Sequence, residues 1–208
     1  MKMIKGAKNW DKKSFHYYQT NNPTDSILTK IFKKKYLETC GPTAAVMCLL
    51  AIDKDVKITC PGTYSIQTEE VLSDWFNDPK VAHLREAIRK GVDYIPGNRI
   101  PQFYPEAVKH VYGFHDAEFK WTKNIAGFLW SGHSVQLCLK KPGHFVTAVA
   151  YDDYSGDIIY HDPWPERKGL KNKGFKERLT VKEQKNNLQN YCIVYFDTEK
   201  IILLKRSV

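Results

Sequence analysis

The sequence predicts an α+β domain in which a helical N-terminal part precedes an antiparallel β-sheet. In the first half, apolar residues recur at helical spacing between capping residues and terminating glycines. In the second half, short β-branched and aromatic runs alternate with Gly, Pro and Asp turns. Helices followed by a series of strands are typical of α+β proteins. No repeat or low-complexity linker divides the chain, so residues 1–208 are expected to form a single domain.

The clearest helix is predicted over residues 41–52, directly after Cys40. Pro42 is tolerated in its first turn because the missing N–H would have no helical partner. A helix N-terminus presents unpaired N–H groups and the positive end of the dipole, which favour a thiolate over a thiol. Cys40 is therefore a candidate nucleophile. The alternative is an inert core cysteine, because cysteine is among the most buried residue types.

Three further helices are predicted before the strands begin. Thr68 caps the first of them, and Gly91 and Gly113 end the second and the third as C-caps. A last short helix is expected within residues 122–132. The three helices cover residues 68–76, 80–90 and 105–112.

Five short runs in the second half predict strands, and Ser155-Gly156 predicts a hairpin turn between the second and the third. Another run of β character, residues 14–20, precedes a turn signal at residues 21–23. Residues 1–13 are expected to be a flexible basic segment. The five strands are predicted at residues 135–139, 145–151, 158–160, 191–196 and 201–204.

The chain carries 32 basic and 23 acidic residues, which gives a formal net charge of +9. The basic residues concentrate in residues 1–35 and 166–185, a pattern compatible with a surface that faces a polyanion. Nucleic acid and an anionic cell-wall polymer fit this charge equally, and so does a surface of solvated lysines without such a partner. No run reaches the ~20 apolar residues of a membrane-spanning helix, and no apolar signal segment opens the chain. The protein is therefore expected to be cytoplasmic as synthesised and to reach a cell wall only after release.

The five cysteines are an odd number without a CxxC pair, which argues against a disulfide framework and against a structural zinc site. Cys48 and Cys138 lie in apolar runs and are expected in the core. The histidines share no spacing typical of metal ligands. Neither a metal nor a cofactor is expected, and the oligomeric state is left open.

Two polar residues lie at the open end of the predicted hairpin. His144 precedes one of its strands, and Asp162 follows the other. Adjacent strands are about 5 Å apart, so an imidazole and a carboxylate placed there can hydrogen-bond. An imidazole held in this way can take a thiol proton, while the carboxylate fixes its tautomer.

Three neighbouring polar residues are not expected in the same site. Asp152 and Asp153 lie at the far end of the strand that His144 begins. A strand rises about 3.3 Å per residue, so both are too far from His144 to be its partner. His161 precedes Asp162 but points to the opposite face of its strand by alternation. The predicted site therefore combines one histidine and one carboxylate with the cysteine.

Three segments carry a family resemblance. They are Cys40-Gly-Pro-Thr, the Gly-His-Phe-Val segment that contains His144, and the strand that ends at Asp162-Pro. Together they resemble the C39-like cysteine peptidases of the papain-like superfamily, over roughly residues 15–164. The resemblance implies a papain-like fold with the catalytic cysteine on a central helix. The histidine and the aspartate would lie on the C-terminal sheet against which that helix packs.

The resemblance also implies a glutamine upstream of the cysteine, whose amide helps to form the oxyanion hole. The segment Phe-His-Tyr-Tyr-Gln makes Gln19 the candidate. Preorganised N–H donors are needed because the tetrahedral intermediate places negative charge on an oxygen. The backbone N–H of Cys40 would be the second donor.

The expected function is that of a cysteine peptidase or amidohydrolase that cleaves a peptide or amide bond through a thioester acyl-enzyme. Small size and positive charge suit a lysin that cleaves peptidoglycan stem peptides, and they suit an intracellular processing peptidase equally. Two other classes remain open. One is a transglutaminase-like acyl transferase that uses the same triad, and the other is a catalytically inactive basic binding module.

Overall fold

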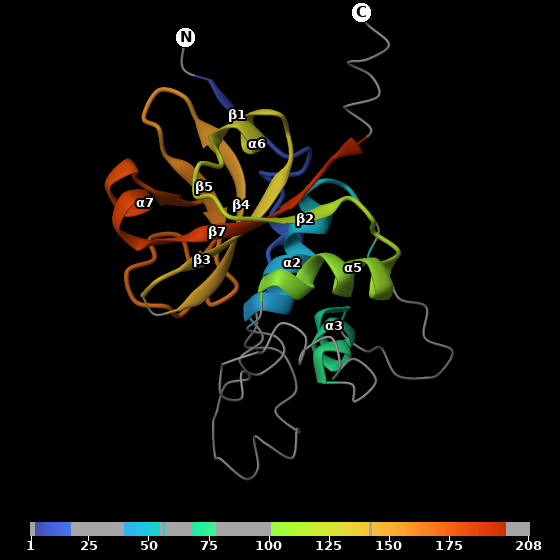
Figure 1. The fold of residues 1–208 in the computed structure, drawn as a ribbon. Helices are drawn as coiled ribbons and strands as arrows, with labels where there is room; N and C mark the ends of the chain where they lie inside the picture. Colours follow the sequence, from blue (N-terminus) through green and yellow to red (C-terminus); the bar gives the residue numbers. More distant parts are fainter. Residues whose placement is uncertain are drawn as a thin grey trace, which may run out of the picture.

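An antiparallel sheet of seven strands forms the centre of the protein (Figure 1). The computed structural model describes residues 3–17, 40–54, 56, 68–77, 101–141 and 143–198. The strands follow the order β2-β7-β3-β4-β5-β6, and β1 pairs with β4 beside this path. They are β1 (Ile4–Gly6), β2 (Ala117–Lys120), β3 (Ser134–Leu139), β4 (His144–Asp152), β5 (Ile158–His161), β6 (Glu177–Leu179) and β7 (Leu188–Tyr195).

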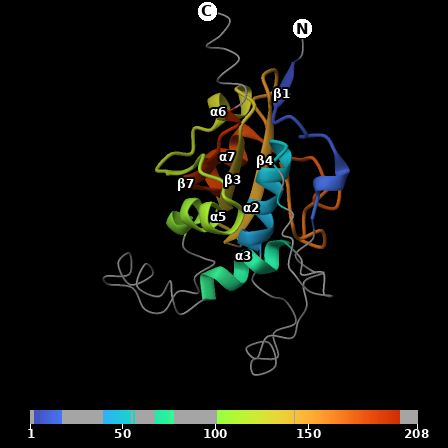
Figure 2. The ribbon, with the colours of Figure 1, turned by 90° about the vertical axis from the view of Figure 1, so that its right-hand side faces the viewer.

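Helices cover both faces of this sheet. Helix α2 lies along β3 and β4 on one face, with α3 and α5 beside it (Figure 2). On the other face Leu129 of α6 joins a second hydrophobic cluster with Leu137 and Val146 of the sheet. The described helices are α2 (Cys40–Ala51), α3 (Thr68–Asn77), α5 (Tyr104–Tyr112), α6 (Ala126–Trp130), α7 (Val181–Asn187) and the 3₁₀ turns η1 (Lys13–Phe15) and η5 (Pro101–Phe103).

The central helix α2 is buried on nearly every side. Ten of its twelve residues are buried, as expected for a helix without a polar face. Three polar side chains of β3 and β4 also donate hydrogen bonds to its backbone carbonyls, which are spaced so that they share one face of the helix. These bonds join Gln136 to Gly41 (3.0 Å), Thr147 to Ala44 (2.7 Å) and Ser134 to Cys48 (2.7 Å). They determine how α2, and with it Cys40, lies on the sheet.

The predicted α+β class is confirmed, as are most of the predicted elements that lie in the described residues. The apolar helix begins at Cys40 itself, and α5 ends at Gly113 in the left-handed conformation (φ 66°). The predicted hairpin consists of β4 and β5, which pair antiparallel around a turn that contains Gly156 (φ 74°). The predicted helix 80–90 and the predicted strand 201–204 lie outside the described residues.

Two predictions for the N-terminal part were wrong where the structure describes it. The run of β character at residues 14–20 instead begins within the 3₁₀ turn η1. Residues 1–13 were expected to be flexible, but Ile4–Gly6 pair with β4 and Ala7 is buried. Gly6 permits this pairing, because a Cβ atom there would lie 2.3 Å from the carbonyl oxygen of Val149. The lysine-rich sequence of this segment shows no strand pattern, because the pairing with β4 uses only backbone groups.

Strands β2 and β6 and helix α7 were not predicted from the sequence. Both strands are short, with four and three residues, so their alternation is too brief to stand out. Helix α7 did carry a signal: Thr180 and Glu183 form a capping box, in which each side chain accepts from the other residue's backbone N–H. This spacing of Thr and Glu could have identified the helix.

Candidate active site

Cys40 is the first residue of α2, where the backbone N–H groups of the first helical turn have no helical acceptor. Its side chain is half-buried, whereas the other cysteines in the described part of the chain, Cys48, Cys138 and Cys192, are buried. All four are free thiols. Cys40 is therefore the described cysteine that combines partial access to solvent with a place at the N-terminus of a helix.

His144 is the first residue of β4 and is only 4% exposed. Its Nε2–H donates to Oδ1 of Asp162 over 2.7 Å. Cys40 is near enough to the imidazole to act on its pKa directly. Because Nε2 is engaged by the carboxylate, Nδ1 is the ring atom left for the thiol. The structure thus brings the three predicted residues together, with His144 between Cys40 and Asp162.

Asp162 directly follows β5 and is fully buried. Oδ1 accepts from His144 and from the backbone N–H of Trp164 (2.8 Å), and Oδ2 accepts from Nε of Arg167 (2.6 Å). The Arg167 guanidinium also donates to the hydroxyl of Tyr160 over 3.0 Å. Both carboxylate oxygens therefore have partners, and one of these partners, Arg167, is a permanent cation.

The backbone of Asp162 is held from two further sides. Its N–H donates to the carbonyl of Gly174 (2.8 Å), and its carbonyl oxygen lies 2.8 Å from Nε2 of His16. Gly174 has φ 84°, and a Cβ atom there would lie 2.4 Å from the Asp162 carbonyl oxygen. Glu177 organises the same loop, because its carboxylate accepts the backbone N–H groups of Lys171, Asn172 and Gly174.

Arg167, Gly174 and His16 were missed as supports of the site. No periodic pattern or motif marks them, because they act from loops and from a distant N-terminal segment. Arg167 follows Asp162 by only five residues, and an arginine close to a predicted buried carboxylate was the one signal available.

The pKa values of His144 and Asp162 agree with the geometry of their hydrogen bond. Burial by itself lowers the pKa of His144, but the hydrogen bonds with Asp162 and Cys40 and the charges of both groups outweigh it and raise that pKa to about 9. Burial alone would raise the pKa of Asp162, yet its contacts with His144 and Arg167 hold it below its ordinary value. A charged imidazolium beside an ionised carboxylate is therefore the stable state at neutral pH.

The polar neighbours excluded on sequence grounds have other partners. Asp152 is fully buried and binds Arg178 Nη1 at 2.8 Å. His161 stacks on Phe175, accepts from the backbone N–H of Lys176 and lies 3.0 Å from the carbonyl oxygen of Trp10. Burial lowers the pKa of His161 to about 3, so this imidazole stays neutral. Neither residue belongs to the group that contains Cys40.

Gln19 lies outside the described residues, so its predicted role stays a prediction. Within the described ranges, no group of three or more His, Cys, Asp or Glu side chains is arranged to hold a metal ion. The helices in that part of the chain are also too short or too polar to cross a membrane.

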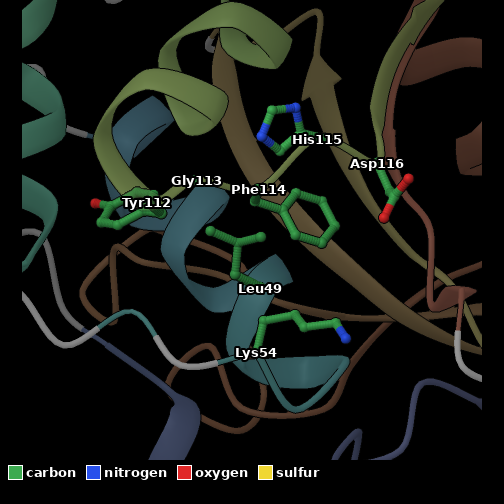
Figure 3. A pocket seen from close by; sticks show the side chains of 7 residues that line it. All are labelled: Leu49, Lys54, Tyr112, Gly113, Phe114, His115 and Asp116. Atoms are coloured by element: carbon green, nitrogen blue, oxygen red, sulfur yellow. The ribbon is translucent and has the colours of Figure 1, made fainter.

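A cavity of about 300 Å³ lies at the other end of α2 (Figure 3). Leu49 and Lys54 contribute to it from α2 and the residues just after it. At 1.5 Å per residue, roughly 13 Å of helix separates Leu49 from Cys40. The cavity therefore does not belong to the Cys40 site. Its lining consists of Leu49, Lys54, Tyr112, Gly113, Phe114, His115 and Asp116.

Comparison with known protein families agrees with this geometry. The family model described as the Peptidase_C39 like family matches residues 13–193, a range that includes Cys40, His144, Asp162 and Gln19. No curated protein matches the chain.

Proposed function

Because this chain belongs to the Peptidase_C39 like family, we propose that it is a cysteine peptidase that cleaves a peptide or amide bond through a thioester on Cys40. The observation that carries the proposal is the hydrogen-bonded pair of His144 and Asp162 beside Cys40 at the N-terminus of α2. A nucleophile, a base and a group that orients the base are the parts that acyl transfer requires. We also propose that the domain has a papain-like fold, which the position of Cys40 on a central helix supports.

In the proposed reaction, the proton of the Cys40 thiol already resides on His144, and the thiolate attacks the carbonyl carbon of the substrate. The new C–S bond places negative charge on the carbonyl oxygen, which the Cys40 backbone N–H and the Gln19 amide stabilise. The tetrahedral intermediate then expels the amine, which takes its proton from His144. Water, deprotonated by His144, attacks the thioester, and the carboxylic acid leaves as the thiol is restored.

Asp162 keeps the imidazole in the tautomer that this sequence needs. It accepts from Nε2, so Nδ1 exchanges the proton with sulfur, and its negative charge stabilises the imidazolium that forms. Its own orientation depends on Trp164 and Arg167.

We propose that the substrate is a peptide presented on an anionic support, of which the stem peptides of peptidoglycan are the leading example. The net charge of +9 supports this, because a basic protein is held at a polyanionic surface by long-range attraction. An unsupported polypeptide is the competing substrate, and the same experiment tests both.

The test is to incubate the protein with purified peptidoglycan and with a denatured protein, and to identify the fragments by mass spectrometry. We expect new carboxyl termini from the wild type and none from Cys40→Ala or His144→Ala. An added primary amine that appears in the product would indicate acyl transfer instead of hydrolysis. If both variants kept full activity, the proposal would be wrong. If the wild type cleaved nothing and iodoacetamide showed no preference for Cys40, a binding module would be the better reading.

A further inference from the structure

Three aromatic side chains form a cluster at the β2 edge of the sheet: two are partly buried, and Trp121 is exposed. We name Phe119, Trp121 and Tyr191 the aromatic ledge. The ring of Trp121 meets Phe119 edge-on at 5.1 Å and Tyr191 edge-on at 6.1 Å, and Phe119 lies 5.8 Å from Tyr191. Trp121 is nevertheless 69% exposed, the most exposed tryptophan in the described part of the chain. Most of this large apolar surface is therefore open to solvent, although its rings are held by their neighbours.

The ledge lies on the same face of the sheet as α2. Phe119 is paired with Ile193, which belongs to the core cluster beneath α2, and both Phe119 and Tyr191 pack against that cluster. The charged residues of β2, Glu118 and Lys120, alternate to the other face and bond to each other. The ledge thus presents aromatic rings to solvent, while the charges of its own strand face away.

The sheet connects the ledge to the site around Cys40. Tyr191 and Cys138 of β3 are near enough to shift each other's pKa, and Cys138 is the register partner of Phe145, the residue after His144. Burial, and then the charge of Cys40, raise the pKa of Cys138, which places Cys138 within electrostatic range of Cys40.

The strand order sets the distance between the ledge and Cys138. β2, β7 and β3 are neighbours, so two strand spacings, about 10 Å, separate Trp121 from Cys138. An extended peptide covers the length from Trp121 to Cys138 in about three residues, so a peptide bound at Cys40 needs at least three residues to reach the ledge.

We propose that the aromatic ledge binds an apolar side chain of the substrate peptide, three or more residues from the bond that Cys40 attacks. The inference rests on the proposed function, since it assigns a subsite to the same reaction. Aromatic faces without a charged group from their own strand favour an aliphatic or aromatic side chain over a charged one. The edge-on contacts also limit the motion of Trp121, so little conformational entropy is lost when a side chain packs on it.

The test uses thiol-reactive peptides, because they report binding near Cys40 without a known substrate. Chloroacetyl-peptides and peptidyl chloromethyl ketones extend from the sulfur in opposite chain directions. Each type is made as a tetraglycine and with one phenylalanine at each position in turn. The second-order rate of Cys40 alkylation is measured by intact mass. We expect one phenylalanine position, the third residue or the fourth, to raise this rate about tenfold over tetraglycine, the order that a filled apolar subsite supplies.

Variants of the ledge then identify the cause of this gain. Trp121→Ala should remove it, so that the phenylalanine and tetraglycine probes react at equal rates, and Trp121→Phe should retain part of it. Tyr154→Ala is the matched control, because Tyr154 is 81% exposed on the turn after β4. That turn is roughly 25 Å from His144 along the strand. This control should keep the full gain.

Three outcomes would overturn the inference. One is that no phenylalanine position reacts faster than tetraglycine, and another is that the gain survives in Trp121→Ala. The third is that a chloroacetyl probe carrying a sugar gains from Trp121 while the phenylalanine probes do not, which would make the occupant a glycan. If Cys40 reacts with no probe and shows no preference for iodoacetamide, the proposed function itself fails, a result distinct from equal rates for all probes.

Discussion

Nε of Arg167 lies 2.6 Å from Oδ2 of Asp162, so a permanent cation holds the carboxylate oxygen that His144 does not use. The two oxygens of Asp162 are thereby divided: one orients the imidazole, and the other is held by an arginine that is itself bonded to Tyr160. A fully buried carboxylate with partners on both oxygens has a single orientation. This contact gives Arg167 a defined positioning role, which can be tested.

Replacing Arg167 with Met should weaken both stability and activity. Removing one partner of a buried ion pair leaves the other charge uncompensated, which costs about 3 kcal/mol in the free energy of unfolding. Urea titrations at pH 7 measure this loss, and we expect kcat to fall while KM changes little. Arg178→Met is the matched control, since it breaks the ion pair with Asp152 away from the site. An Arg178 variant that lost kcat equally would contradict the assignment.

The activity should fall as the pH rises through about 9. In the proposed reaction His144 must be protonated to give the leaving amine its proton, and its pKa in the folded protein is raised to about 9. Alkylation of Cys40 by iodoacetamide requires only the thiolate and should not fall over this range. Profiles of kcat/KM and of the alkylation rate against pH compare the two. The raised pKa also stabilises the fold, fully below about pH 6.5 and progressively less as the pH rises through 9.

Asp162→Asn should move the alkaline fall of activity to lower pH. The amide can still accept from Nε2 of His144, but it no longer supplies the negative charge that stabilises the imidazolium. The pKa of His144 must therefore decrease, and the protonated imidazole is lost earlier. The kcat/KM profile of the variant measures this shift. An unchanged alkaline limb would show that another group controls it.

Gly174→Ala should destabilise the protein by about 2 kcal/mol or more, because left-handed strain and a steric clash add together. The new Cβ atom would lie 2.4 Å from the Asp162 carbonyl oxygen, so Asp162 must move and kcat should fall as well. Gly169→Ala is a matched control with φ 95° and no atom within 4 Å of the added Cβ. Thermal unfolding and kcat for both variants separate the strain, which they share, from the clash.

Thr147→Val tests whether the polar contacts between β4 and α2 stabilise the central helix. The substitution keeps the shape but removes the donor to the Ala44 carbonyl, at an expected cost of about 1 to 2 kcal/mol. Chemical denaturation measures the loss. We expect iodoacetamide to react with Cys40 at a changed rate, because the first turn of α2 shifts. An unchanged stability and an unchanged rate would mean that packing alone positions the helix.

The members of the site were predictable from the sequence because each marks the end of a strong local pattern. Cys40 begins an unbroken apolar run, and His144 and Asp162 flank two strands joined by a turn. Antiparallel pairing then necessarily places the last two at one end of the hairpin. The α+β class followed in the same way, from the order of helical and strand patterns along the chain.

Only the tertiary structure decided how these residues are supported. The contacts of Arg167, Gly174 and His16 with Asp162 join loops and a distant segment whose sequences carry no periodicity. Likewise, Trp121 and Tyr191 are in contact because β2 pairs with β7. A strand of four residues is too short for its sequence to predict this pairing. Local patterns report which backbone conformation a segment prefers. Contacts between distant segments depend on the packing of the whole chain, and that information is present only in the fold.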